Sequence, residues 1–412
     1  MRQRNQFASL TSISLAAVIW FSASVQVGYG AARCPARYKR ACIFFAAGIL
    51  AVGNAASSSR TGPVQLLLLG VLCGIWGTWS RPLVRQLFLV AGVTYVVAAL
   101  ALPWLAGLDL SINGIAARLR AGDAPCVSRL TLWSNVLHLI AQKPWLGWGW
   151  GELDYAHYIT LYDGPRFCDI LDNAHNLPLH LAVELGVPLA VAVCGGFAWW
   201  VLRQKPWRDT DPTRQLAWSV MAVILLHSLL EYPLWYGPFQ MAFGLCLVLL
   251  WQTRPHSSEA LSPQLETTKH PVVLYLAVSV AIFMIAVSGY AAWDYHRISQ
   301  IYLAPEARAA AYRTETLSKI QGSVFFGDQV RFAELLLTPL TPRNAQWTFD
   351  TAASLLHFSP EPRVIEKVIE SAVMLGRGND ALMHLARYRA AFPVDYARWA
   401  ESSSTTLSLL RF

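Results

Sequence analysis

Long apolar runs separated by short polar connections fill this chain as far as residue 292. A helix needs about 20 apolar residues to cross the hydrocarbon core of a bilayer. The first run contains several serines and a glutamine, but it is longer than the core of a secretory signal peptide, so we interpret it as a span. The pattern predicts eight membrane-spanning helices, at residues 7–29, 41–56, 63–79, 84–106, 177–202, 216–230, 238–251 and 271–292.

The basic residues of the connections predict the orientation of these spans. Arg and Lys are concentrated in every second connection, and connections of that kind stay in the cytoplasm. The long loop 107–176, the short connection 231–237 and the region from residue 293 onward are therefore expected in the periplasm. Met1 falls on the same side, where Arg2 and Arg4 are unusual, and this suggests that further helices precede the sequence.

The composition changes from Asp294 onward, where charges are frequent and balanced and apolar residues recur at helical spacing. We expect short amphipathic helices packed as hairpins; a tetratricopeptide-like array is an alternative, but no clean 34-residue period emerges. The clearest apolar stripes are Val364, Ile365, Val368 and Ile369, and then Ala381, Leu382, Leu385 and Ala386.

The predicted fold class is therefore all-α, a polytopic membrane helix bundle of about eight spans with a large periplasmic loop and a C-terminal periplasmic helical region. The expected domains are N-terminal spans at 1–106, the periplasmic loop at 107–176, C-terminal spans at 177–292 and the periplasmic helical domain at 293–412.

Composition supports a membrane protein and argues against a nucleic-acid-binding one. Hydrophobic residues make up 55% of the chain and charged residues only 14%, whereas a soluble domain carries about 25% charge. The net charge of +8 comes largely from the loops that set topology, so we expect contact with membrane lipids and no nucleic acid.

Cysteine usage predicts one disulfide and no metal site. Cys126 and Cys168 both lie in the long loop expected in the oxidising periplasm, and we predict that they are bonded to each other. No CxxC motif and no Cys/His cluster occurs, so neither a metal nor another cofactor is expected.

Two segments contain arginines suited to binding an anion. Arg60 lies among hydroxyl residues at the end of a predicted span, where it either reaches the headgroups or contributes to a phosphate site. Arg129 begins an amphipathic helix that ends in a turn where tryptophan and glycine alternate. Trp148 and Trp150 of that turn either form an interfacial aromatic belt or line a groove for a sugar or a polyprenyl chain.

Two further segments contain ionisable and aromatic residues. His175 ends the long loop, where a neutral imidazole can accept a proton from a hydroxyl, although a loop histidine is more often structural. His180 and Glu184 are four residues apart on one helix face and can pair inside the bundle. Glu231, Tyr232 and Tyr236 lie in a short connection where aromatic residues are expected whatever the function, but a glutamate is less routine.

All four segments are assigned to one membrane face. This convergence indicates an enzyme that joins a membrane-borne anionic substrate to a periplasmic acceptor. A transporter or a non-enzymatic scaffold is the alternative from a different class, but a transporter usually places ionisable groups at mid-membrane in several spans.

Segments 58–62, 129–151 and 173–184 together resemble the O-antigen ligase and polymerase superfamily (Wzy C-terminal domain). Segments 231–239 and 294–303 resemble the companion C-terminal region of bacterial protein O-oligosaccharyltransferases of the pilin-glycosylation type. The resemblance implies a multi-pass protein of the inner membrane that transfers a glycan from undecaprenyl diphosphate to a periplasmic hydroxyl. The acceptor is then either Ser or Thr of a protein such as pilin, or a glycan such as the lipid A core.

The resemblance also assigns roles to residues. His175 falls on the essential loop histidine of the family, Arg129 on an arginine thought to contact the diphosphate, and Arg60 on a second basic position. Tyr232 falls near a functional tyrosine, for which Tyr236 is the alternative match. Since the family normally has more spans than eight, an N-terminal block is expected to be missing from this sequence.

Overall fold

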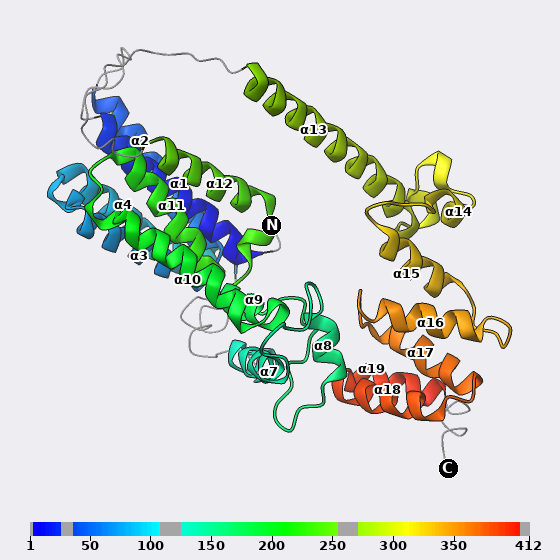
Figure 1. Cartoon of the computed structure of the whole chain (residues 1–412). Helices are drawn as coiled ribbons and strands as arrows, with labels where there is room; N and C mark the ends of the chain where they lie inside the picture. Colours follow the sequence, from blue (N-terminus) through cyan, green and yellow to red (C-terminus); the bar gives the residue numbers. More distant parts are fainter. Residues whose placement is uncertain (1–2, 26–35, 108–124, 254–270, 404–412) are drawn as a thin grey trace. The chain divides into compact units, whose positions relative to one another are not determined.

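The computed structural model describes residues 3–25, 36–107, 125–253 and 271–403, and every regular element in these ranges is helical (Figure 1). This confirms the all-α class. The chain divides into two compact units, which are described separately below. The first contains Met1–Leu153, Gly164–Phe167 and Leu171–His256, and the second contains Asp154–Asp163, Cys168–Ile170 and Ser257–Phe412.

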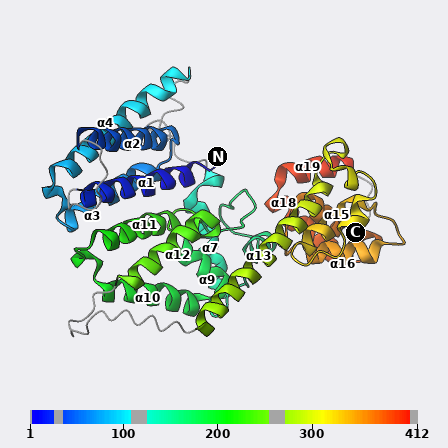
Figure 2. The same cartoon turned by 90° about the horizontal axis from the view of Figure 1, so that it is seen from above.

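The first unit is a bundle in which α1 packs against α2, α3 and α11 (Figure 2). Helix α4 packs on α2, and α12 packs on α11. The helices are α1 (Arg4–Val25), α2 (Ala36–Ala56), α3 (Thr61–Ile75), α4 (Pro82–Leu105), α7 (Arg129–Gln142), α9 (Leu177–Leu185), α10 (Val187–Gln204), α11 (Pro212–Ser228) and α12 (Gly237–Gln252). Short 3₁₀ helices are η1 (Thr78–Ser80), η2 (Pro125–Val127), η3 (Pro206–Arg208) and η4 (Pro233–Trp235).

Helix α1 shows why this bundle forms. Its buried positions recur at three- and four-residue spacing and are mostly small, which lets neighbouring helices approach closely when no water drives them together. Ser9, Ser12 and Ser22 therefore face other helices, whereas Ser14 is exposed. The buried residues of this stripe are Ala8, Ser9, Ser12, Leu15, Ala16, Ile19 and Ser22.

Within the described ranges, each predicted span falls mostly on helix, but the helices differ in length. Among the described residues, four helices, compared with the eight predicted spans, are long and apolar enough to cross a membrane: Arg37–Ala56, Pro82–Leu105, Val187–Arg208 and Val278–Tyr302. Helices α3 and α12 are apolar but shorter, with 15 and 16 residues. Residues 26–29 of the first predicted span lie outside the described residues.

The predicted span 177–202 is wrong as a single helix, because the structure divides it at Gly186. Gly186 has φ of 87°, a conformation that a side chain disfavours. A Cβ atom there would lie 2.1 Å from the carbonyl oxygen of Trp145. The Val187 N–H donates to the carbonyl of Pro144 over 2.8 Å instead of continuing the helix. Helix α9 therefore has only nine residues, and α10 alone has the length of a span.

The second unit contains short amphipathic helices that follow the long helix α13 (Pro271–Ser299), as the sequence predicted. The remaining helices are α8 (Leu153–Ile159), α14 (Thr316–Ile320), α15 (Gly327–Leu337), α16 (Ala345–Leu355), α17 (Pro362–Met374), α18 (Gly378–Ala391) and α19 (Pro393–Ser402). Short 3₁₀ helices are η5 (Gln300–Tyr302), η6 (Pro305–Ala307) and η7 (Ala310–Tyr312).

The two predicted stripes of this unit have different outcomes. Val364, Ile365, Val368 and Ile369 are fully buried on α17, as expected. On α18 the stripe is only partly right, since Leu382 is 45% exposed. The buried positions of α18 are instead Ala381, His384, Tyr388 and Ala391, because the two large polar aromatic side chains turn inward and find hydrogen-bond partners.

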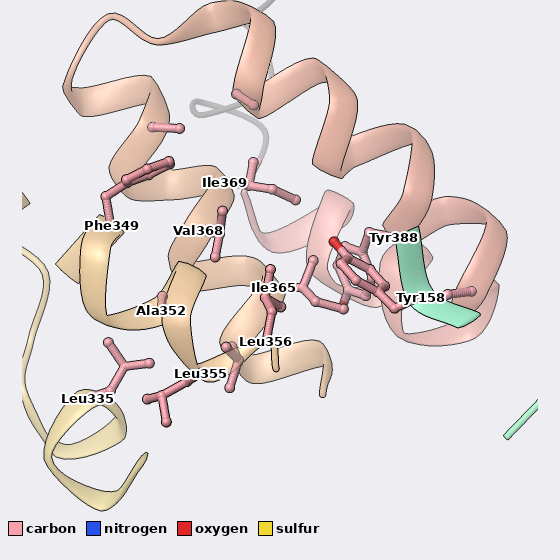
Figure 3. Close-up of a cluster of buried hydrophobic side chains, with 14 of the residues drawn as sticks. Tyr158, Leu335, Phe349, Ala352, Leu355, Leu356, Ile365, Val368, Ile369 and Tyr388 are labelled. Carbon is pink, nitrogen blue, oxygen red and sulfur yellow. The ribbon is translucent and has the colours of Figure 1, made fainter. Parts of the chain in front are cut away.

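Tyr158 of α8 lies in the core of the second unit, beside Tyr388 (Figure 3). Its ring is 2% exposed, and its hydroxyl is 2.9 Å from Nδ1 of His384. We expect Tyr158→Ala to destabilise the protein by about 3–5 kcal/mol, the usual loss for a buried aromatic residue. The Tyr158→Phe variant keeps the ring and should lose only about 1 kcal/mol. Thermal unfolding of the full chain in detergent measures both; equal stability of the Ala and Phe variants would show that α8 contributes little to this core.

Candidate functional site

The first unit contains a cavity of about 680 Å³. Its walls come from segments far apart in the sequence: the start of α1, the connection between α2 and α3, the start of α7, the loop before α9, and the end of α11 with the connection to α12. All four segments that the sequence singled out contribute side chains from their predicted residues to this lining. The ionisable side chains of the lining are Arg4, Arg60, Arg129, His175, His227, Glu231, Tyr232 and Tyr236.

The carboxylate of Glu231 binds three donors. Its Oε2 lies 3.0 Å from Nδ1 of His175. Its Oε1 accepts hydrogen bonds from Nη2 of Arg129 and, over 3.0 Å, from Nδ2 of Asn5. One carboxylate therefore holds a guanidinium group, an amide and an imidazole in fixed positions around the cavity.

Glu231 is an anion at physiological pH. Burial by itself would raise the pKa of this carboxyl group, but the hydrogen bond from His175 and the electrostatic interactions with His175 and Arg129 outweigh it. The pKa of Glu231 is thereby lowered to about 2. A permanently ionised carboxylate can hold the imidazole in one tautomer, with the proton on Nδ1.

The loop backbone around His175 is fixed from several sides. The His175 N–H donates to Oδ1 of Asn173 over 2.9 Å. Nε1 of Trp133 on α7 donates to the carbonyl of Ala174, and Nδ2 of Asn176 donates to the carbonyl of Leu229 at the end of α11. His175 itself has φ of 51°, which is uncommon for a residue with a side chain. Such strain persists where the surroundings enforce it, and it is concentrated at functional sites.

The contact with Glu231 distinguishes the two ring nitrogens of His175. Nδ1 is used by Glu231, so the lone pair of the neutral ring is on Nε2. The ring edge contacts Tyr232, with 5.0 Å between ring centroids and 88° between planes. His175 also lines the cavity. A hydroxyl group bound in the cavity can therefore give its proton to this nitrogen.

The arginines give the cavity an excess of positive charge. Arg129 is the first residue of α7, whose N-cap is Ser128. Nη2 of Arg129 is bound to Glu231, whereas Nη1 is buried and has no hydrogen-bond partner among the described residues. Arg4 and Arg60 also line the cavity, against a single carboxylate. Such a site favours an anion, and guanidinium groups suit the oxygens of a phosphate.

Tyr232 and Tyr236 stack on each other at one wall, with 5.8 Å between ring centroids. The hydroxyl of Tyr236 accepts a hydrogen bond from Nε2 of Gln3 over 2.7 Å. Burial raises the pKa of Tyr232 well above its usual value, and its contact with Tyr236 and the negative charges of Asp172 and Glu231 add to the shift. Tyr232 therefore stays protonated and can donate a hydrogen bond, but it cannot serve as a base near neutral pH.

The other predicted residues lie outside the lining of this cavity. His180 and Glu184 form a buried pair on α9, with 3.5 Å between Nε2 and Oε2. Trp150 stacks on Trp235 and contacts the ring of His180. Nε1 of Trp148 donates to the carbonyl of Leu139 on α7. These contacts connect the tryptophan turn with α9 and with the connection before α12.

Glycine is needed in the tryptophan turn because the backbone at the end of α9 lies close to it. The N–H of Gly149 donates to the carbonyl of Glu184 over 2.9 Å. Gly147 has φ of 70°, and a Cβ there would lie 2.3 Å from the same carbonyl oxygen. At Gly147, the backbone that approaches this turn closely is therefore that of the end of α9.

The two cysteines of the predicted bond, Cys126 and Cys168, are disulfide-bonded. By contrast, Cys42, Cys73, Cys194 and Cys246 are free. Cys126 and Cys168 are thus in the oxidation state that the predicted pairing requires. Cys34 lies outside the described residues.

Sequence reasoning missed Arg4, Asn5 and His227 as residues of the site. Arg4 had left a signal, since it was the basic residue that did not fit the expected periplasmic side. In the structure, Arg4 lines the same cavity as Arg60 and Arg129. Asn5 lies just before the first predicted span and His227 lies inside another, and the local sequence pattern gave no indication of either residue.

Comparison with known families and proteins gives a consistent result. A model described as O-antigen ligase matches residues 45–194, and one described as virulence factor membrane-bound polymerase, C-terminal, matches residues 215–406. A third, described as protein glycosylation ligase, matches residues 1–21. Together the three matches cover most of the chain, including the segments that form the cavity.

A curated protein named General O-oligosaccharyltransferase, from Acinetobacter baylyi (strain ATCC 33305 / BD413 / ADP1), is 24% identical over 233 residues. The matched region is 53% of this chain and 39% of that relative, so the chain spans well under half of the relative's length. No solved structure matches this chain significantly.

Proposed function

Because the chain belongs to the family of O-antigen ligases and protein glycosylation ligases, we propose that it transfers an oligosaccharide from undecaprenyl diphosphate to a hydroxyl group in the periplasm. The observation that carries the proposal is the group formed by His175, Glu231 and Arg129 in a cationic cavity. It provides a proton acceptor and a phosphate-binding group within one site.

Each residue has a defined part in the proposed reaction. The acceptor hydroxyl gives its proton to Nε2 of His175 while its oxygen attacks the anomeric carbon of the glycan. The bond between that carbon and the phosphate oxygen breaks, and undecaprenyl diphosphate leaves with the bonding electrons. Arg129, with Arg60 and Arg4, stabilises the negative charge that develops on the diphosphate. Glu231 stabilises the imidazolium ion that forms on His175.

The proposed acceptor is Ser or Thr of a protein such as pilin. Support comes from the relative named as a general O-oligosaccharyltransferase and from the match to the protein glycosylation ligase model. Transfer to a glycan such as the lipid A core is the second candidate, which the O-antigen ligase match favours. A transporter or scaffold is less well supported, because neither role requires the pairing of His175 with Glu231.

A cell-based experiment separates the two acceptors. The chain is expressed in cells that make a lipid-linked glycan and contain both a pilin-like protein and an unmodified lipid A core. Mass spectrometry should detect the glycan on Ser or Thr of the protein. Modification of the lipid A core alone would establish the second candidate, and modification of neither would contradict the proposed transfer.

We also propose that the protein is a multi-pass protein of the inner membrane, with about eight spans and with the cavity and residues 293–412 facing the periplasm. The alternating basic connections support this orientation. Alkaline phosphatase, which is active only in the periplasm, should be active when fused after Ser299 and inactive when fused at Lys205. The reverse pattern would show that the orientation is inverted.

Replacing Arg129 by Lys should reduce transfer by about 10-fold or more, since a charged hydrogen bond is worth about 1.5–3 kcal/mol. Lysine keeps the charge but cannot bind Glu231 and a diphosphate oxygen with two separate nitrogens of a planar group. Initial rates at matched membrane levels measure the effect. Arg203→Lys on α10, away from the cavity, is the control and should transfer normally. Unchanged rates in the Arg129→Lys variant would remove Arg129 from the diphosphate site.

A further inference from the structure

His227 lines the same cavity but has no part in the reaction proposed above. It lies near the end of α11, and its backbone carbonyl accepts the N–H of Glu231 over 2.8 Å. The side chain is fully buried, with 0% exposure. A polar ring in such a place needs hydrogen-bond partners, and its two nitrogens differ in what they contact.

The hydrogen bonds of Nδ1 determine where the proton of the ring lies. Nε2 of Gln65 on α3 donates to Oγ of Ser9 on α1 over 2.6 Å. Oγ of Ser9 lies 2.8 Å from Nδ1 of His227. Among the described residues, that nitrogen is the acceptor available to the Ser9 hydroxyl proton. Nδ1 therefore accepts, and in the neutral ring the proton is on Nε2.

Nε2 of His227 is buried and has no hydrogen-bond partner among the residues that the structure describes. A buried N–H without an acceptor is unfavourable, so an occupant of the cavity is expected to supply one. Nη1 of Arg129, which lines the same cavity, is also buried and has no hydrogen-bond partner among the described residues. Nε2 of Gln6, which also lines the cavity, has no partner among the described residues either. Three donors without acceptors in one cationic cavity fit an anionic ligand with several oxygens.

We infer that His227 is a second binding residue for the diphosphate, and that its Nε2–H donates a hydrogen bond to a diphosphate oxygen. Ser9 and Gln65 are positioning residues that keep the proton of the imidazole on the side of the cavity. The inference rests on the proposed function, because it takes the diphosphate as the ligand. The added contact contributes to binding of the lipid-linked sugar donor, and it has no part in removing the proton from the acceptor hydroxyl.

Two substitutions separate this role from a structural one. In His227→Gln, the terminal amide nitrogen can replace Nε2 in the cavity, while the contact with Ser9 is lost. In His227→Asn, the shorter amide can replace Nδ1 beside Ser9, while the donor in the cavity is lost. If His227 binds the diphosphate, the Asn variant should bind diphosphates more weakly. If His227 only packs against α1, the Gln variant should be the one with weaker binding.

The test measures binding to the purified full chain in detergent, with farnesyl diphosphate, inorganic pyrophosphate and farnesol as probes. We expect His227→Asn to bind both diphosphates about 10-fold more weakly than wild type, or worse, from the usual worth of a charged hydrogen bond. His227→Gln should bind them nearly as well as wild type. Farnesol contains no diphosphate, so its binding should not distinguish the variants.

Different failures have different meanings. If wild type binds farnesyl diphosphate and His227→Asn binds it equally well, the inference about His227 is wrong while the proposed function stands. If wild type binds pyrophosphate but not farnesyl diphosphate, or neither, the lipid-linked donor and the inference both fail. Should His227→Asn not fold, Ser9→Ala replaces it, because loss of the hydroxyl frees the tautomer and should also weaken diphosphate binding; unchanged binding by Ser9→Ala would overturn the inference.

Discussion

Replacing His175 by Asn should lower glycan transfer by about 10²–10⁴-fold, the usual contribution of a general base. Asn is the most informative substitution here for two reasons. It tolerates the left-handed backbone at φ of 51°, so the loop should keep its shape. Its amide nitrogen can also take the place of Nδ1 and donate to Glu231. The variant therefore removes Nε2, the atom proposed to accept the proton, with little other change.

The measurement is the initial rate of transfer at matched membrane levels, with His138→Asn as the control. His138 is an exposed histidine on α7 outside the cavity, so its variant should transfer normally. If His175 only shapes the loop, the Asn variant should retain nearly full activity. That result would exclude the general-base role, whatever the activity of an Ala variant.

Replacing Glu231 by Gln should reduce transfer by about 10³–10⁴-fold, a loss similar to that seen when the carboxylate of a catalytic triad becomes an amide. The size and shape of the side chain are kept, but the negative charge is lost. An amide can donate to Nδ1 of His175, which would move the ring proton to Nε2 and remove the proton acceptor from the cavity. Arg129 would also lose its ion pair and become free to take other positions.

The same transfer assay checks this prediction. Asp163→Asn, which neutralises an exposed carboxylate elsewhere in the chain, is the control. A general loss of negative charge would affect both variants equally, whereas the proposed role affects only Glu231. Wild-type rates in the Glu231→Gln variant would mean that the carboxylate contributes to folding rather than to the reaction.

Most of the apolar helices were predictable from the sequence, because such helices appear in it as continuous apolar runs. The exception at Gly186 shows the limit of this reasoning. A glycine inside an apolar run is compatible with an uninterrupted helix, and the break depends on the backbone of Trp145, which lies 2.1 Å from where a Cβ would be. Similarly, α8 was not predicted to join the second unit, since a helix of seven residues shows little periodicity.

Several residues that line the candidate site were singled out by the sequence, but the organisation of the site was not predictable. Arg129, His175 and Glu231 each stood out for residue type and position. The sequence gave no indication of the partners of Glu231, because they lie far from it along the chain. Arg129 is 102 residues away and Asn5 is 226 residues away. The contact between His227 and Ser9 was unpredictable for the same reason, because the two residues lie on different helices and are 218 residues apart in the sequence. Local patterns predict elements, whereas a polar network depends on how the elements pack.

The central claim is that this chain breaks the bond between a glycan and a lipid diphosphate and gives the glycan to a hydroxyl group. The most direct measurement follows both products in a purified system that contains the full chain, an undecaprenyl-diphosphate-linked glycan and a peptide rich in Ser and Thr. We expect glycosylated peptide and undecaprenyl diphosphate to appear in equal amounts, with neither formed by the His175→Asn variant. Release of undecaprenyl monophosphate, or peptide modification that is equally fast in that variant, would contradict the account.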